Sequence, residues 1–505
     1  MADALVLLLP AVLLFSSLWL LSALFPAKQR ELINAPKLRN EFVAHPPLNS
    51  RPWVHRGLLR GWYNFASLLI LTYYIRHVYV MLRTTGSVFS PAAVNYLLRV
   101  FLWEGGDFVI VVLAEYLALY YAFIIQWIMA QCNLGQGART MLGWTQHVWM
   151  MGMLFMACKH ALDGKELKSL SFRFATVAQC CVMCMKMHSY LLANAQLWRS
   201  KKEANPTAID STNKSLSEVM TLLKARGVDE QLIAENESNK EVRAREILKE
   251  IEKMDALRAT VYPDNVNLKN FFRFSVMPVL VYEPRYPTRD RISVGYLMQK
   301  LCEIVGLITL LWLVLEYHIH PSVRSLASGQ LNDPVLIITE MIAPVSCFFV
   351  LLFFIVFDCI LPALAEVSGL ADRGFYSDWW NSTMFEEFSR KWNKPVHEYL
   401  LRHVYAESLY SLNLSKRNAA IFTFLVSIVI HEIIVIAITG IFRPYLAFFS
   451  LLQIPLQTVM RSSLFQGKRL GNIAFWTGII CGLPLIVSLY FKDYCATPGR
   501  CDFIA

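Results

Sequence analysis

The chain has 505 residues, of which 55% are hydrophobic, and its mean hydropathy is +0.40. This composition indicates a polytopic membrane protein rather than a soluble one. The formal net charge of +10 does not indicate a nucleic-acid partner, because the basic residues gather at the ends of apolar runs and in polar loops. Basic residues in such places orient membrane spans and attract anionic lipid headgroups.

Ten apolar runs are long enough, or nearly so, to cross a bilayer as helices. In chain order they cover residues 4–25, 62–82, 108–130, 141–160, 172–195, 293–316, 335–364, 419–440, 443–460 and 470–491. A lumenal N-terminus leaves the more basic connections in the cytosol, which agrees with the positive-inside rule. Those cytosolic connections are residues 26–61, 131–140, 196–292, 365–418 and 461–469. A retained first span is favoured over a cleaved signal peptide, because no basic segment precedes the first run.

The runs divide the chain into five parts. These are a first span with a cytosolic segment (1–61), an N-terminal transmembrane bundle (62–195), a charged cytosolic loop (196–292), a membrane core (293–494) and a lumenal tail (495–505). Within the loop, Glu241–Leu257 has the pattern of an amphipathic helix. The polar segment 366–418 is rich in Trp and Tyr, which favour the membrane–water interface. It predicts short interfacial or re-entrant helices, with Pro395 at the start of one.

His431 and Glu432 lie in the middle of the apolar run 419–440. A charged side chain at the centre of a span disfavours insertion by roughly 2.5–3.5 kcal/mol, so such residues mark a candidate functional site. An imidazole can act as a general base near neutral pH; the alternative is a buried histidine bonded to the backbone of a neighbouring helix. Adjacent helical residues point about 100° apart, so we expect one side chain to face a reaction cavity and the other a polar partner. Val435 replaces the second histidine of the H-E-x-x-H pattern, which disfavours metal hydrolysis.

Cys181, Cys184 and His188 fall on one face of a predicted helix, and thiolates with an imidazole are typical zinc ligands. All three lie within or at the end of an apolar span, where cysteine commonly packs as a small hydrophobic residue. The packing interpretation is favoured, and no metal site is predicted. His188 stays a candidate cavity residue near the cytosolic end of its span.

The run Phe375–Asn381 (FYSDWWN) is the most specific local pattern in the chain. The amide of Asn381 supplies two donors that suit a carbonyl or thioester oxygen. Basic and imidazole side chains that could bind the phosphates of a nucleotide-like cofactor follow this run. They are Arg390, Lys391, Lys394, His397, Arg402 and His403. For any single one of them, contact with a lipid headgroup is the favoured interpretation.

FYSDWWN resembles the F-Y-x-D-W-W-N signature of the acyl-CoA:sterol and acyl-CoA:diacylglycerol branch of the membrane-bound O-acyltransferases. His431 matches that family's catalytic histidine, and 392–405 (WNKPVH and LRHVY within it) is similar to the intervening sequence of the branch. The resemblance covers about 172–494. It implies an all-α membrane fold with about 9–10 transmembrane helices around a buried reaction tunnel, in the endoplasmic reticulum membrane, as a homodimer or homotetramer.

The choice of acceptor is less direct. Met185–Tyr190 (MKMHSY) and Asn270–Tyr286 are more similar to sterol O-acyltransferases, particularly the fungal ones. Cys495 and Cys501 resemble the paired lumenal cysteines of animal sterol acyltransferases, which implies a disulfide. Against this, Phe465–Gly467 with Gly471–Asn472, and then Trp476 and Asp493–Tyr494, resemble the diacylglycerol branch. The family's usual Tyr-Pro-Arg reads Tyr286-Pro287-Thr288-Arg289 in this chain. Because Arg289 is displaced by one position, the resemblance leaves the role of this arginine in doubt. A sterol acceptor is favoured and diacylglycerol is the alternative.

The resemblance implies roles for individual residues. His431 would take the proton of the acceptor hydroxyl, and Asn381 with Trp380 would position the thioester. Lys391, Lys394, His397 and Arg402 would bind the coenzyme A head, while His188 and Glu432 would contact the acceptor. Fatty acyl-CoA would be a co-substrate, transfer would be direct, and no bound cofactor or metal is expected. A proton-coupled transporter using His431 and Glu432 is the alternative from another functional class.

Overall fold

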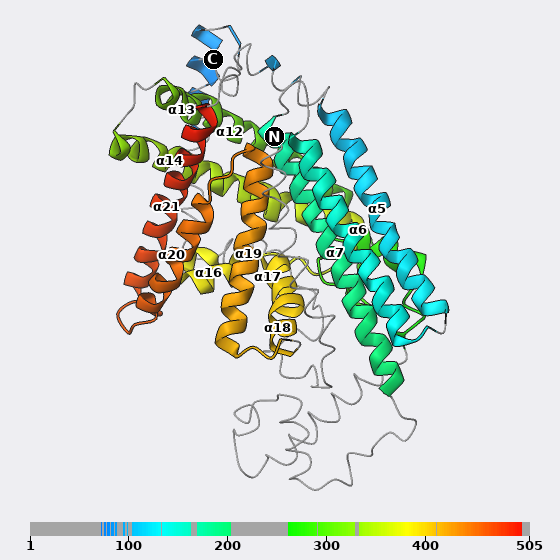
Figure 1. Cartoon of the computed structure of the whole chain (residues 1–505). Coiled ribbons are helices and arrows are strands. Elements are labelled where there is room, and N and C mark those ends of the chain that lie inside the picture. Colours follow the sequence, from blue (N-terminus) through cyan, green and yellow to red (C-terminus); the bar gives the residue numbers. More distant parts are fainter. Residues whose placement is uncertain are drawn as a thin grey trace, which may run out of the picture.

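The computed structural model describes residues 104–132, 134–162, 169–203, 261–289, 291–328, 333–410 and 412–496, with scattered residues between 72 and 98. The regular elements in these ranges are helices, and a single isolated β-bridge joins Thr288 to Leu370 (Figure 1). The predicted all-α fold is confirmed. The first predicted span (4–25), most of the second, Glu241–Leu257 and Cys501 lie outside the described residues.

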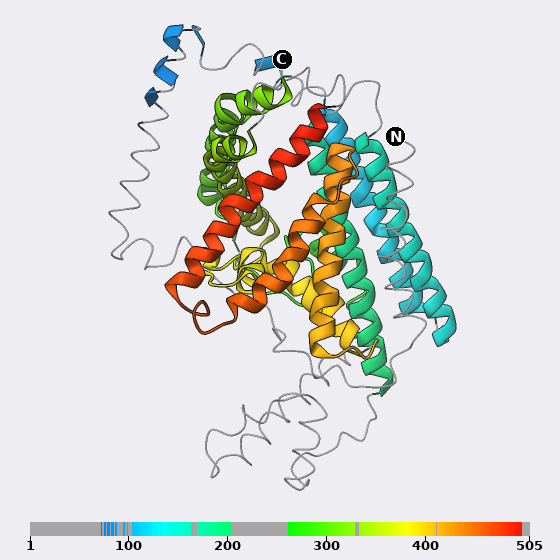
Figure 2. The same ribbon diagram turned by 60° about the vertical axis from the view of Figure 1, so that its left-hand side comes forward.

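Three long helices form a bundle on one side of the molecule (Figures 1 and 2). They are α5 (Gly105–Gln131), α6 (Gln136–Leu162) and α7 (Leu170–Glu203). By length and composition only α5 of the three qualifies as a membrane span, because α6 and α7 carry many polar residues. Several of these polar side chains are buried between helices, and Gln146 Nε2 donates to the Met187 carbonyl at 2.8 Å. The two helices predicted from 141–160 and 172–195 therefore exist, and their buried faces carry polar side chains among the apolar ones.

The middle of the chain forms two further long helices, each interrupted by a π turn. In the first, α12 (Val294–Val314) continues through the π segment Leu315–Ile319 into α13 (His320–Ala327). In the second, α14 (Pro334–Phe353) continues through Phe354–Ile360 into α15 (Leu361–Ser368). Both are long and apolar enough to cross a membrane. π turns commonly mark functional positions in helices, and the second one carries Asp358, which contacts the signature segment.

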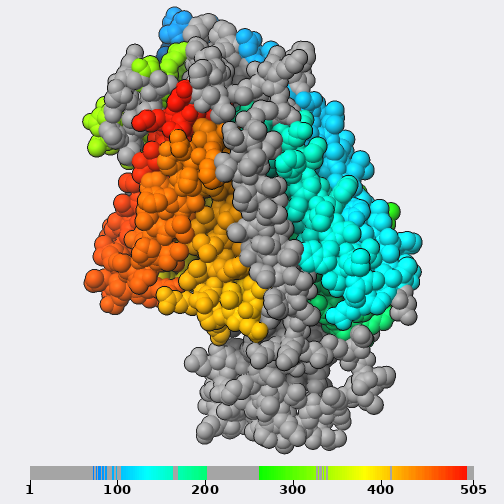
Figure 3. Space-filling model, in the orientation of Figure 1, coloured from blue at the N-terminus to red at the C-terminus, as the bar shows by residue number. Residues whose placement is uncertain are grey.

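The C-terminal part of the described chain folds as three successive antiparallel helices, α19 (Lys416–Thr439), α20 (Tyr445–Met460) and α21 (Arg469–Cys495). The Ser415 side chain caps the start of α19, and Gly440, at φ 66°, ends it in the left-handed conformation that glycine adopts without strain. In Figure 3 these helices and the α5–α7 bundle form opposite flanks of the face shown. The two groups meet where α19 packs on α6 and α7, and Arg173 Nη1 donates to the Ile438 carbonyl at 3.0 Å.

Short helices occupy the polar segment, as predicted. They are α16 (Phe385–Trp392), α17 (Lys394–Leu400), the π turn Leu401–Tyr405 and α18 (Ala406–Tyr410). The predicted helix start at Pro395 is confirmed, because Asn393 Oδ1 caps α17 by accepting from the Val396 N–H at 3.2 Å. The aromatic rings here pack into the protein core: Trp379 is 3% exposed and contacts Phe353, with the ring centroids 5.3 Å apart. Edge-to-face packing of this kind stabilises beyond burial alone.

The order of the helix ends agrees with the predicted membrane topology. The α5–α6 turn, the end of α7, the start of α19 and the α20–α21 loop lie toward one end of the molecule, and the α19–α20 turn and the end of α21 lie toward the other (Figure 1). Within the described ranges, five helices satisfy the length and hydropathy of a span, and α20 is a shorter apolar helix. The protein is therefore a multi-pass membrane protein. The total of 9–10 spans and the side that faces the cytosol stay predictions.

Candidate active site

His431 projects from α19 with its side chain exposed. Its Nδ1 lies 2.7 Å from the Ser427 carbonyl, one turn earlier in the same helix. A carbonyl oxygen only accepts, so in the neutral ring Nδ1 carries the hydrogen and Nε2 presents a lone pair. The alternative interpretation, a buried histidine bonded to a neighbouring helix, differs from the structure: the ring is exposed and bonds its own helix through Nδ1. Nε2 is the nitrogen suited to accept a proton.

Glu432 points in a different direction from its neighbour, as the helical geometry predicts. Its side chain is buried, with the Tyr490 hydroxyl 2.9 Å from Oε1 and the Ala447 N–H donating to Oε2 at 3.0 Å. These partners belong to α21 and α20, so Glu432 connects all three C-terminal helices. Both carboxylate oxygens of Glu432 are thus hydrogen-bonded within the protein. Its predicted contact with the acceptor stays a prediction.

The signature segment is held at its start by the helices around it. The Tyr376 hydroxyl donates to Asp358 Oδ1 at 3.1 Å, and Lys300 Nζ lies 3.4 Å from Asp358 Oδ2. Lys300 also pairs with Glu303 at 2.7 Å. Among the described residues, Glu303, Asp358 and Cys359 are the one group whose ligand atoms are close enough to hold a metal. Because Lys300 already places a positive charge between the two carboxylates, we interpret the group as an ion-pair network that anchors Tyr376.

Asn381 ends a short 3-10 turn, Trp379–Asn381, and its side chain is exposed. The Asn381 N–H donates to the Asp378 carbonyl at 3.1 Å, and its Nδ2 lies at the longer distance of 3.4 Å from Asp378 Oδ2. The amide is thus weakly engaged and free to turn toward a ligand. The carbonyl of the preceding residue, Trp380, accepts hydrogen bonds from two side chains of α21.

The predicted coenzyme A residues fall into two groups. Lys391 and Arg402 are paired: Lys391 Nζ lies 2.8 Å from Glu387 and 3.2 Å from Asp378, and Arg402 bonds Glu283. Lys394 and His397 lie on one short helix, α17. Partial burial, with the nearby charges of Arg390 and Lys394, lowers the pKa of His397, so this imidazole is neutral at physiological pH. The binding role of all four stays a prediction.

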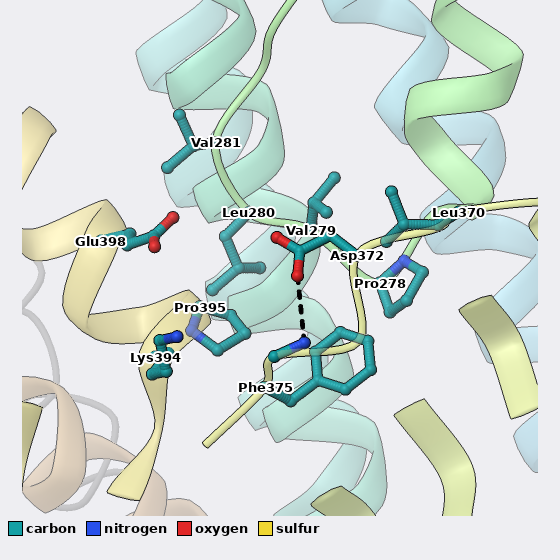
Figure 4. A pocket seen from close by; sticks show the side chains of 11 residues that line it. Pro278, Val279, Leu280, Val281, Leu370, Asp372, Phe375, Lys394, Pro395 and Glu398 are labelled. Atoms are coloured by element: carbon teal, nitrogen blue, oxygen red, sulfur yellow. Dashed lines mark hydrogen bonds between the residues drawn. The ribbon is translucent and has the colours of Figure 1, made fainter. Parts of the chain in front are cut away.

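A small cavity, partly open to solvent, lies beside the signature segment. Its walls come from three stretches of chain, 278–281, 370–375 and 394–398 (Figure 4). Leu280, Val279 and Phe375 are apolar lining residues, and the carboxylate of Asp372 lies among them. Lys394 and Glu398 stand at one edge, so apolar and charged groups meet at this cavity.

His188 is buried in a polar cluster between α7 and the short helices. Its Nδ1 lies 2.8 Å from the Tyr399 hydroxyl, and its ring packs edge-on against His147 and His403, with centroids 5.7 and 5.8 Å away. Burial, with the adjacent Arg402 guanidinium, lowers the pKa of His403 to about 3. His188 and His403 were both predicted as candidate site residues, but the contact of His188 with Tyr399 was not, because the two residues lie 211 positions apart in the chain. The predicted contact of His188 with the acceptor hydroxyl stays a prediction.

The cysteines considered as candidates from the sequence lie in two places, the core and the end of α21. Cys181 and Cys184 are buried free thiols in the core, and Cys184 Sγ donates to the Met150 carbonyl at 3.6 Å. They pack as small hydrophobic residues, as favoured above. Cys495, at the end of α21, is disulfide-bonded. Its predicted partner, Cys501, lies outside the described residues.

The family model described as MBOAT, the membrane-bound O-acyltransferase family, matches residues 97–492. The chain belongs to the membrane-bound O-acyltransferase family. Sterol O-acyltransferase 2 of Candida albicans is 34% identical over 412 residues, which cover 75% of this chain and 66% of that protein. Sterol O-acyltransferase 1 of Saccharomyces cerevisiae is 33% identical over 324 residues, covering 61% of this chain and 50% of that protein. The predicted similarity to fungal sterol acyltransferases is confirmed.

A relative from the other branch matches a smaller part of the chain. Diacylglycerol O-acyltransferase 1 of Dictyostelium discoideum is 32% identical over 245 residues, covering 48% of this chain and 39% of that protein. The chain spans between 39% and 66% of the length of these three relatives.

Proposed function

We propose that this chain is an acyl-CoA-dependent sterol O-acyltransferase of the endoplasmic reticulum, which joins a long-chain fatty acyl group to the 3-hydroxyl of a membrane sterol. The observation that carries the proposal is the state of His431: a family-matched imidazole on a spanning helix, with Nδ1 bonded and Nε2 open. A ring fixed in this tautomer is prepared to accept a proton.

In the reaction, His431 Nε2 takes the proton from the sterol hydroxyl as the oxygen attacks the thioester carbonyl. The tetrahedral intermediate then collapses, the carbon–sulfur bond breaks, and the proton passes to the coenzyme A thiolate. Asn381 donates to the carbonyl oxygen while negative charge develops there. No acyl-enzyme forms, so no cysteine is required as a nucleophile.

The two substrates differ in polarity, and the described residues fit this difference. The acyl-CoA head is highly charged, and Lys394 lines the cavity of Figure 4 on a short helix, α17, outside the long spans. His397 lies on the same helix. We place the head there and the acyl chain along the apolar interior. The sterol is almost wholly apolar and reaches His431 from the bilayer. Bringing the two together in a protein interior orients them and excludes water as a competing acceptor.

One experiment separates the acceptors. The purified full-length protein is incubated in sterol-containing nanodiscs with radiolabelled oleoyl-CoA, and in parallel nanodiscs with diacylglycerol. Steryl ester as the main product supports the proposal. Triacylglycerol as the main product supports the alternative, which the Dictyostelium relative and Phe465–Gly467 favour. Absence of both esters, with intact folded protein, rejects the proposed function. Size-exclusion chromatography with light scattering in the same preparation tests the proposed dimer or tetramer.

A further inference from the structure

One helix contacts both candidate catalytic regions, which lie in different parts of the fold. The first turns of α21 contact the turn that carries Asn381, through Asn472 and Trp476. Near its other end, Tyr490 contacts Glu432, the neighbour of His431. Pro484 lies inside α21 between these two contacts. One helix therefore packs against both regions.

The contact at the Asn381 turn is made by side-chain donors and backbone acceptors. Asn472 Nδ2 donates to the carbonyls of Trp380 and Ser382, both at 2.9 Å. Trp476 Nε1 donates to the same Trp380 carbonyl at 3.1 Å. The Trp380 carbonyl belongs to the peptide unit just before Asn381, and the Ser382 carbonyl to the unit just after Ser382. These bonds therefore hold the turn on both sides of Asn381. In the sequence, Asn472 and Trp476 stand out only as residues that resemble the diacylglycerol branch. Their hydrogen bonds could not be predicted, because the acceptors are backbone carbonyls, which every residue has.

Two glycines let α21 approach this turn closely. A Cβ at Gly471 would lie 2.2 Å from the Phe465 carbonyl oxygen and 3.0 Å from that of Thr383. A Cβ at Gly478 would lie 2.6 Å from Phe385 Cζ, on the helix that follows the turn. Backbone oxygens cannot move away as a flexible side chain can. Close approach of α21 to residues 380–385 is therefore built into the sequence of the helix.

We propose that α21 sets the position of Asn381 relative to His431, with Asn472 and Trp476 as positioning residues for the reaction. They touch no substrate atom; they hold the turn so that the Asn381 amide meets the thioester oxygen as charge develops. Interactions made only in the transition state change kcat rather than KM. Disturbing this turn should therefore lower kcat and leave the KM for acyl-CoA unchanged. The inference rests on the proposed function.

The test compares Asn472→Asp, Trp476→Phe and Thr477→Val in the full-length protein. Asp keeps the shape of Asn, suits the first turn of a helix, and lacks both donors. Thr477 is the matched control, since its hydroxyl bonds only within α21, to the Ile473 carbonyl at 2.9 Å. We expect kcat to fall about 10- to 100-fold in Asn472→Asp, since small misplacements of catalytic groups have effects of this size. A smaller fall is expected in Trp476→Phe, where Asn472 still holds the carbonyl, and none in Thr477→Val.

Hydrogen–deuterium exchange on the same proteins provides a readout independent of activity. The amides of Asn381 and Ser382 should exchange faster in Asn472→Asp than in Thr477→Val, with the rest of the chain unchanged. Equal kcat in all three variants overturns the inference, and so does faster exchange spread over the whole chain. If Asn472→Asp does not fold, Trp476→Phe decides by the same criteria. If the wild type forms no ester, the proposed function fails, and the exchange result alone judges whether α21 holds the turn.

Discussion

Two histidines on spanning or near-spanning helices, His431 and His188, have opposite surroundings. His431 is exposed on α19, and the partner of its Nδ1 is a carbonyl of the same helix. His188 is 5% exposed on α7, and its Nδ1 partner is the hydroxyl of Tyr399, from a different part of the chain. One ring offers a nitrogen to an incoming ligand, whereas the other joins two parts of the protein.

The comparison shows what separates a candidate base from a structural histidine. Both residues are costly to place in an apolar run, so cost alone marks both as unusual. A base must also reach its proton, which requires an open nitrogen in a fixed tautomer. His431 meets that condition, and His188 lies inside an aromatic and imidazole cluster with His147 and His403. The predictions that follow test whether this difference in surroundings is a difference in role.

The largest effect is expected from His431→Ala. Removal of a general base lowers turnover by roughly 10²- to 10⁴-fold. Because the exposed ring bonds only its own helix, protein abundance and acyl-CoA binding should be retained. The measurement is ester formation per mole of folded protein, with binding followed by a fluorescent acyl-CoA.

Thr423→Val is the matched control for this change, since Thr423 lies on α19 and its hydroxyl bonds only the Ala419 carbonyl, at 2.8 Å. Its turnover should stay near wild type. Turnover above about a tenth of wild type in His431→Ala would be too high for a lost general base and would remove the assignment.

An intermediate effect, on stability rather than turnover, is expected from His188→Ala. The change leaves the buried Tyr399 hydroxyl without its partner, which costs about 1–3 kcal/mol. We expect a lower thermal inactivation midpoint and little change in kcat per folded molecule. His318→Ala, at an exposed histidine, controls for loss of an imidazole. A raised KM for sterol at unchanged stability would instead make His188 an acceptor-binding residue and break the comparison.

The fold was largely predictable because its signals are local. The apolar runs predicted α5, α12, α14, α19, α20 and α21, and Pro395 predicted the start of α17. The aromatic segment was the exception in environment. Its rings favour interfaces in general, yet Trp379 is buried against Phe353. Which of two environments an aromatic ring adopts depends on partners distant in sequence.

The site was predictable only in part, for the same reason. His431 and Asn381 each carry a sequence signal, one as a polar residue in an apolar run and the other in FYSDWWN. The residues that hold these two side chains in place carry no such sequence signal. Asn472 bonds backbone carbonyls, and Arg402, predicted to bind phosphate, pairs with Glu283, 119 positions away. A side chain's chemistry is visible in sequence, whereas its partner is set by the fold.

The smallest effect is expected from the pH dependence of stability at the buried cluster of His147, His188 and His403. Burial and Arg402 lower the pKa of His403 to about 3, below the ordinary value of 6.5. The unfolded chain therefore binds a proton at this residue below pH 6.5 while the folded chain does not. Stability attributable to His403 is complete above pH 6.5 and falls as the pH decreases toward 3, with a loss of about 2 kcal/mol by pH 5.

His403→Gln should flatten this acid-side loss, because glutamine does not titrate, whereas His318→Gln should leave it unchanged. The measurement is the thermal inactivation midpoint in detergent between pH 7.5 and 5 for the wild type and both variants. The same slope in all three proteins would mean that water or acid reaches the cluster in the folded state. His188 and His403 would then be as open as His431, and burial could no longer distinguish the two kinds of histidine.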